Sequence, residues 1–153
     1  MLSLLLSLWL LLFSPALSAE PADWRAEMLA AVNELRAQGC RCGGKYMAPA
    51  PPLTLHPQLT EAAQRHANDM YRHRYFSHQG RNGSRLGERV SATGYRWRGV
   101  AENIAHGQTS VAQVMRSWRN SPGHCRNLMN PDYRHFGIGY QDDYWVQVFA
   151  RPW

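Results

Sequence analysis

The order of hydrophobic periodicities along the chain constrains its fold more than any other feature of the sequence. Apolar residues recur at helical spacing within 23–39, 57–70 and 110–121, whereas apolar and polar residues alternate within 95–104 and 136–150. The order is therefore helices first, then a strand, a helix and a hairpin, without regular βαβ alternation. This order predicts a single α+β domain with a mainly antiparallel sheet.

Local signals place the ends of the predicted helices. Asp23 is a suitable N-cap for the first helix, and Gly39 ends it. Pro57 suits the first turn of the second helix, which carries an apolar stripe. Ser84 is predicted to cap a short third helix that Gly94 terminates.

The remaining segments are predicted from their glycines and prolines. Residues 40–52 contain two adjacent glycines and three prolines and are predicted to form a loop, followed by an extended segment at 53–55. Residues 141–143 are the expected hairpin turn. The stretch 121–131 is interrupted by Pro and Gly at one end and by Asn-Pro at the other. It holds His124, which we interpret as a candidate site residue.

The N-terminus has the pattern of an export signal. Residues 2–13 are apolar apart from two serines, and small residues follow. The apolar run is shorter than the roughly 20 residues that a transmembrane helix needs. We therefore predict a signal peptide at 1–19, cut after Ser18 or Ala19, and one mature domain at 20–153. The mature protein is expected to be secreted, extracellular or periplasmic, and monomeric, with no transmembrane span.

Three cysteines in an exported chain predict one disulfide and one cysteine left over. Cys40 and Cys42 are poorly placed to bond each other, since the Cα atoms of alternate residues in an extended chain lie about 7 Å apart. A bond from either one to Cys125 would close a loop spanning most of the domain and contribute about 4 kcal/mol on the chain-entropy model. The residues alone do not choose between Cys40 and Cys42.

The chain is basic, with 17 Lys and Arg against 11 Asp and Glu and a formal net charge of +6. Lys45 is its one lysine, so the positive charge is carried by arginine, which suits bidentate contact with carboxylate or phosphate. A solvated surface is the simpler interpretation. No basic helix or set of stacking aromatics supports specific nucleic-acid binding.

Four residues from separate elements are candidates for a shared site: His78, Glu88, Glu102 and His124. Two histidines and two carboxylates could hold a divalent metal, or could form a base with an orienting group. The chain contains neither HExxH nor CxxC, so the spacing by itself is a weak signal.

Simpler interpretations compete with these roles. Glu88 can pair with Arg85 or Arg89 on its own helix. Glu102 could bond the backbone amides of a neighbouring loop. His66 lies on the apolar stripe of the second helix, so we interpret it as a core or boundary histidine rather than a ligand.

Taken together, the motifs resemble the CAP superfamily of cysteine-rich secretory proteins, antigen 5 and plant pathogenesis-related proteins, and more closely its bacterial SCP-like branch. The resemblance extends from about Met28 to Ala150. The motifs that carry it, in chain order, are Phe76-Ser77-His78, Gly94-Tyr95, Glu102-Asn103-Ile104-Ala105, Trp118, Ser121-Pro122-Gly123-His124 and Gly137-Ile138-Gly139-Tyr140. The resemblance implies a three-layer α-β-α sandwich with a cleft on one side of the sheet.

The resemblance also implies site residues. The family cleft carries two histidines and two glutamates and can hold a divalent metal such as zinc; His78 and His124 match its histidines, and Glu102 matches one glutamate. At the position of the other glutamate, this chain has Arg119-Asn120-Ser121. Glu88 could supply a carboxylate from another direction, although it matches no family motif.

The family resemblance chooses a disulfide as well. It implies that Cys42 pairs with Cys125. Cys40 would then be the remaining thiol, free or available for bonding to another molecule.

Three functions follow as hypotheses. The first is a secreted binding or interaction module without turnover, whose partner is a small molecule, a lipid or a surface. The second is a metal-assisted hydrolase of peptides or esters, with His78 and His124 as ligands and Glu102 or Glu88 as base. The third, which the residues favour least, is a phosphodiesterase.

Overall fold

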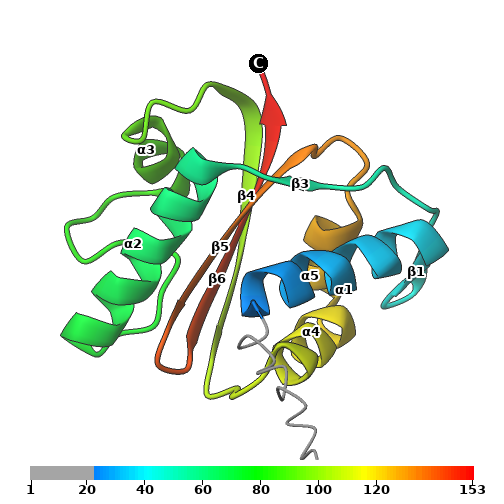
Figure 1. Cartoon of the computed structure of the whole chain (residues 1–153), viewed down its shortest axis with the longest axis horizontal. Helices are drawn as coiled ribbons and strands as arrows, with labels where there is room; N and C mark the ends of the chain where they lie inside the picture. The colour runs from blue at the N-terminus through cyan, green and yellow to red at the C-terminus, as the bar shows by residue number, and fades with distance from the viewer. Residues whose placement is uncertain (1–22) are drawn as a thin grey trace, which may run out of the picture.

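A four-stranded sheet lies between two layers of helices (Figure 1). The structure is a computed structural model that describes residues 23–153; the predicted signal at 1–19 lies outside that range. In sheet order the strands are β3 (Thr54–Leu55), β5 (His135–Gln141), β6 (Tyr144–Pro152) and β4 (Trp97–His106). β3 is parallel to β5, and the other pairings are antiparallel. The predicted α+β class and three-layer α-β-α sandwich are confirmed.

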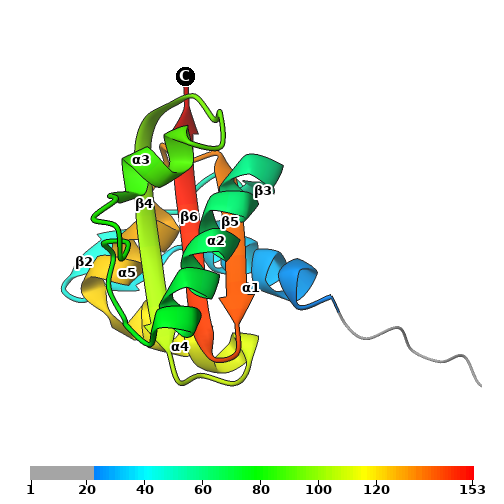
Figure 2. The same cartoon turned by 90° about the vertical axis from the view of Figure 1, so that its left-hand side faces the viewer.

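Each face of the sheet has its own helices and its own apolar core (Figures 1 and 2). One face is covered by α2 (Pro57–His73) and α3 (Leu86–Ser91). The other face is covered by α1 (Trp24–Gln38), α4 (Val111–Asn120) and α5 (Pro122–Met129). Because helices cover both faces, apolar side chains of the strands are buried on each side of the sheet. Phe136 and Ile138 belong to one core, and Val146 and Val148 belong to the other.

Two glycines of β5 let α2 approach the sheet closely. A Cβ at Gly137 would lie 2.2 Å from the backbone of Leu59, and one at Gly139 would lie 2.4 Å from the backbone of Ala63. Ala62 and Ala67 on the same helix are also small and buried. The backbone of α2 therefore packs directly against the sheet, and any side chain at either glycine would push the two apart.

Most of the predicted helix ends are confirmed. The Asp23 side chain accepts a hydrogen bond from the Arg25 N–H, and Gly39 ends α1 with φ +70°. The third helix differs at its start, because Arg85 rather than Ser84 occupies the N-cap position. There the Glu88 carboxylate accepts from the Arg85 backbone N–H at 2.7 Å, so the cap comes from within the helix.

Two segments are more regular than expected. Residues 40–52 were predicted to be a loop, but β1 (Cys40–Cys42) and β2 (Lys45–Met47) pair as a hairpin around Gly43-Gly44. The prediction was wrong because these two glycines form a tight turn, while the three prolines lie beyond β2. The interrupted stretch 121–131 contains α5, in which Pro122 occupies the first turn and needs no N–H partner.

Arg36 ties α1 to the connection between α5 and β5. Its guanidinium is fully buried and donates to four backbone carbonyls and to no carboxylate of the described residues. Burial lowers the pKa of Arg36 to about 10, with a further contribution from Arg134, so the side chain stays charged at neutral pH. The four acceptors are Pro51, Leu128, Asn130 and Tyr133.

The disulfide joins Cys42 of β1 to Cys125 of α5, as the family resemblance implied. The two Cα atoms lie 5.4 Å apart and are 83 residues apart in the sequence. Cys40 is a buried free thiol. The bridge therefore fixes the N-terminal hairpin to the helix that carries His124.

Candidate functional site

Glu102 is the centre of the candidate site. Its side chain is only 3% exposed, and each carboxylate oxygen has a partner. Oε1 accepts from Nδ1 of His78 at 2.9 Å, and Oε2 accepts from the Arg89 guanidinium at 2.7 Å. The His78 side chain is 59% exposed, so the imidazole is open to solvent while its Nδ1 is held by Glu102.

Arg89 is the site residue that the sequence interpretation missed. In the sequence it was only one of two possible partners of Glu88, whereas in the structure it pairs with Glu102 on β4. Its guanidinium also donates to the carbonyls of His78 and Ser84, so it holds the loop before α3 against the strand. In the sequence, Arg89 is one of two arginines close to Glu88, and neither its type nor its spacing identifies a partner 13 residues away on another element.

Side-chain amides, of which those of Asn103 and Gln147 are buried, connect β4 to α5 behind the site. Asn103 Nδ2 donates to the His124 carbonyl and to Gln147 Oε1, both at 3.2 Å. Asn127 Nδ2 donates to Asn103 Oδ1 at 2.9 Å and to the Glu102 carbonyl at 3.4 Å. The network fixes the backbone that carries Glu102 relative to the backbone that carries His124.

His124 lies on α5, half-buried beside this network. Burial lowers its pKa, and the nearby His78 lowers it further, since two cations would repel each other. The structure therefore brings His78, Glu102 and His124 to one region, and its surroundings favour the neutral form of the His124 imidazole.

Glu88 is placed differently from the other three candidates. It is exposed on α3, and its carboxylate caps the N-terminus of its own helix through the Arg85 N–H. It lines a different cavity from that of His78 and Glu102. It therefore does not take the place of the acid that is missing at residues 119–121.

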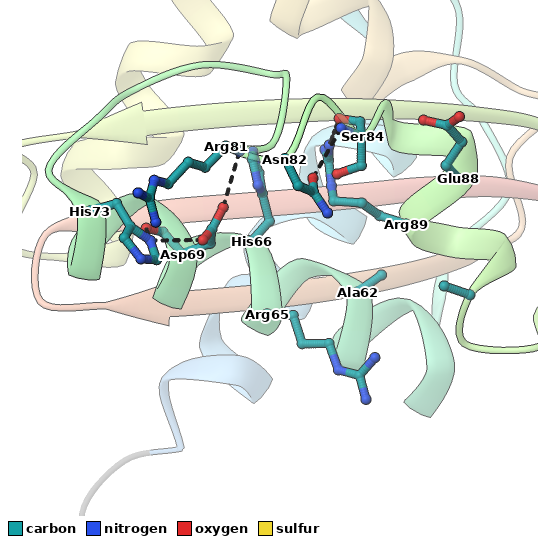
Figure 3. A pocket seen from close by; sticks show the side chains of 11 residues that line it. Ala62, Arg65, His66, Asp69, His73, Arg81, Asn82, Ser84, Glu88 and Arg89 are labelled. Carbon is teal, nitrogen blue, oxygen red and sulfur yellow. Dashed lines mark hydrogen bonds and ion pairs between the residues drawn. The ribbon is translucent and has the colours of Figure 1, made fainter.

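Two cavities flank the Arg89–Glu102 ion pair. His78 and Glu102 line a cavity of about 400 Å³, together with Gln79, Arg85 and Leu86. Arg89 lines a second cavity, of about 760 Å³, between α2 and residues 81–92 (Figure 3). Each member of the ion pair therefore lines a different cavity.

Asp69 organises one end of the larger cavity. It pairs with His73 at 2.9 Å and accepts from the Arg81 backbone N–H (Figure 3), and it also accepts from the Tyr75 hydroxyl. These bonds, with burial opposing them, lower the pKa of the Asp69 carboxyl. The carboxylate thereby fixes residues 75–81 to α2.

His66 is a buried histidine behind the site, as expected from its place on the apolar stripe. Its Nε2 bonds the Ser77 carbonyl at 2.8 Å and lies 4.0 Å from Glu102, while its buried Nδ1 has no hydrogen-bond partner among the described residues. Burial lowers the pKa of His66, and the Glu102 charge opposes that effect. It therefore supports the loop that carries His78.

The donor atoms of the site do not fit a pre-formed metal centre. Glu102 has both oxygens engaged, so the described residues offer two imidazoles and no free carboxylate beside them. Within residues 23–153, the cysteine sulfurs of residues 40, 42 and 125 are the potential ligands that lie within 4.8 Å of one another. Two of these sulfurs are bonded to each other and cannot ligate as thiolates.

Known proteins match the chain over most of its length. The model of the CAP family, the cysteine-rich secretory protein family, matches residues 29–149. Two Bacillus subtilis (strain 168) proteins are each 33% identical: the uncharacterized protein YkwD over 64% of this chain, and the uncharacterized membrane protein YlbC over 61%. The chain spans 39% and 27% of their lengths, respectively. No helix formed by residues 23–153 is long and apolar enough to cross a membrane.

Solved structures show the same fold. An extracellular SCP-domain protein from Bacillus anthracis str. Ames has a TM-score of 0.74 and 27% identity over 82% of this chain and 39% of its own. NaASP2, crystallised with Zn²⁺, has a TM-score of 0.55 and covers 88% of this chain and 81% of its own. At 15% identity, the NaASP2 likeness concerns the fold alone.

Proposed function

The chain belongs to the CAP family of cysteine-rich secretory proteins, and from that premise we propose that it is an exported module that binds a ligand or partner at its cleft without turning it over. One observation carries the proposal: both oxygens of Glu102 are committed, to His78 and to Arg89. A carboxylate held in this way is a structural and orienting group rather than a free base or metal ligand.

The exposed part of the cleft suits recognition. The cavity of about 400 Å³ beside His78 lies within the roughly 300–1,000 Å³ range of small-molecule sites. It presents an imidazole, the Gln79 amide, the Arg85 guanidinium and the apolar Leu86 side chain. These groups suit a ligand that has hydrogen-bonding groups and an apolar part, such as a small amphiphile or a lipid, or a protein side chain on a surface partner.

Hydrolysis is the second candidate, because Glu102 orients His78 as a carboxylate orients a catalytic base. The adjacent hydroxyl does not complete this arrangement, since Ser77 Oγ accepts from the Gln79 N–H in its own loop. Zinc, where it binds, would have His78 and His124 as its protein ligands and would polarise a bound carbonyl or water. We expect such binding to be weak, because the second family glutamate is replaced in this chain.

Metal content and turnover, measured on the same preparations, test the proposal. The protein is purified without chelator, as wild type and as His78→Ala plus His124→Ala, and is analysed for zinc and for turnover of peptides, esters and nucleic acid. We expect substoichiometric zinc and background turnover in both proteins. Stoichiometric zinc that is lost in the double variant, or turnover that requires His78, would replace the binding module with the hydrolase.

Export is the cellular part of the proposal. It is supported by the apolar run at 2–13, by the disulfide, and by the likeness to an extracellular SCP-domain protein. The mature protein is then a single monomeric domain at 20–153. Intact mass and size-exclusion chromatography of the exported protein test this, and an unprocessed N-terminus would contradict cleavage after Ser18 or Ala19.

A further inference from the structure

Three sulfur atoms meet where the N-terminal hairpin packs against α5. Cys40 Sγ lies 3.6 Å from Cys125 Sγ and 3.9 Å from Cys42 Sγ. All three residues are buried, and Cys42 is bonded to Cys125. The free thiol is therefore in contact with both sulfurs of the bridge.

The periodicity of β1 explains why two cysteines face the same partner. Side chains two residues apart in a strand point to the same face, and β1 is buried, exposed and buried along its three residues. Arg41 between them points to solvent. Cys40 and Cys42 consequently share the face that packs on α5, and both reach Cys125.

We propose that Cys125 has two interchangeable bonding partners, so that the bridge exists as two isomers, Cys42–Cys125 and Cys40–Cys125. This inference is independent of the proposed binding function. In the exchange, the Cys40 thiolate attacks Cys125 Sγ, a new S–S bond forms, the bond to Cys42 breaks, and Cys42 leaves as a thiolate that takes up a proton. Atoms and electrons balance within the chain, so the exchange needs no oxidant or reductant.

The surroundings of Cys40 determine how fast the exchange runs. Burial raises the pKa of the Cys40 thiol, and the positive charge of Arg119 on α4 opposes that effect. Cys40 Sγ lies beside the bridge, at similar distances from both of its sulfurs, so its side chain must rotate into line before attack. Exchange should therefore be slow at neutral pH and faster under mildly alkaline conditions, where more thiolate forms.

The two isomers differ in how α5, the helix that carries His124, is anchored to β1. Cys125 follows His124 directly on α5, and exchange moves its covalent anchor by two residues along β1. The choice of bridge therefore changes how the N-terminus of α5 is held.

Thiol mapping of the wild-type protein tests the proposal. The folded protein is incubated at about pH 9 without reductant, then acidified, denatured and labelled with N-ethylmaleimide before peptide mapping. We expect label on Cys42 as well as on Cys40, rising with time to a plateau that does not change on tenfold dilution. Label confined to Cys40 at the plateau would overturn the proposal.

Two variants sharpen the test. Cys40→Ser, treated identically, should show no label on Cys42 or Cys125, and label there would mean that exchange does not use Cys40 and would also overturn the proposal. Oxidised Cys42→Ser should be a monomer with no thiol to label, because Cys40 then bonds Cys125; two labelled thiols or a disulfide-linked dimer in a folded variant would contradict it. The wild-type experiment stands without this variant if its fold is lost.

Discussion

Replacing Arg89 with methionine tests whether the Arg89–Glu102 pair holds the site together. Methionine keeps an apolar stem of similar length but removes three hydrogen bonds, at 2.7 Å to Glu102, 2.9 Å to the His78 carbonyl and 3.1 Å to the Ser84 carbonyl. The Arg89 side chain is 11% exposed and that of Glu102 is 3% exposed, so water cannot replace the lost partner well.

Removing one member of a buried ion pair typically costs about 3–5 kcal/mol, because the other charge is left buried and unpaired. We expect Arg89→Met to lower the free energy of unfolding by about that amount, with a fall in Tm on the order of 10 °C. Urea denaturation followed by tryptophan fluorescence measures the change. Arg72→Met is the matched control, since Arg72 is exposed on α2, and we expect a change within about 0.5 kcal/mol.

A double-mutant cycle separates the pair from the residues themselves. Glu102→Gln removes the charge that Arg89→Met leaves unpaired, so the double variant should be more stable than the sum of the single changes predicts, by about 2 kcal/mol or more. A cost of Arg89→Met below about 1 kcal/mol, or additivity of the two changes, would show that Arg89 and Glu102 do not act as a buried ion pair.

Three further predictions follow from the fold and the site. Gly137→Ala should destabilise the protein by about 3 kcal/mol or more in urea denaturation, because its Cβ would lie 2.2 Å from the backbone of α2. The control Gly123→Ala, whose Cβ would have no atom within 4 Å, should be neutral or stabilising in the same assay. Burial lowers the pKa of His66 and His124 in the folded state, so the unfolded chain binds more protons than the folded one at acidic pH. The contribution of these two histidines to the free energy of unfolding should be complete above about pH 6.5 and should be lost as the pH falls through their lowered pKa values. A Tm that stays constant down to about pH 5 would contradict this. Arg36→Lys should cost about 2–4 kcal/mol in thermal or urea unfolding, because an ammonium cannot reach all four buried carbonyls, and a cost near zero would show that the guanidinium geometry is unimportant.

Much of the fold could be predicted because its signals are local. Asp23 and Gly39 delimit α1 because each forms a hydrogen bond with a residue of the adjacent helical turn. Pro57 begins α2 because a proline at the first helical position needs no hydrogen-bond acceptor. The β1–β2 hairpin was missed because strands of three residues are too short to show a period, and the prolines that follow them outweighed the Gly43-Gly44 turn.

The sequence pointed to some residues of the candidate site but not to how they pair. The motifs led to His78 and Glu102, and the structure brings them together at 2.9 Å. That Arg89 would choose Glu102 over its sequence neighbour Glu88 depends on where α3 lies against β4, which is a tertiary contact without periodicity. The partners of Arg36 could not be predicted either, because they are backbone carbonyls, which every residue has whatever its side chain.

The reach of Arg36 has a consequence for the order of folding. Three of its four acceptors lie 92 to 97 residues further along the chain, and the Cys42–Cys125 bridge nearby spans 83 residues. Contacts of such sequence separation form only after a large loop has closed, whereas the β5–β6 turn closes within a few residues. We therefore expect α1 and the β1–β2 hairpin to dock late, onto a sheet that is already assembled. Until then, Cys40 and Cys42 remain accessible thiols.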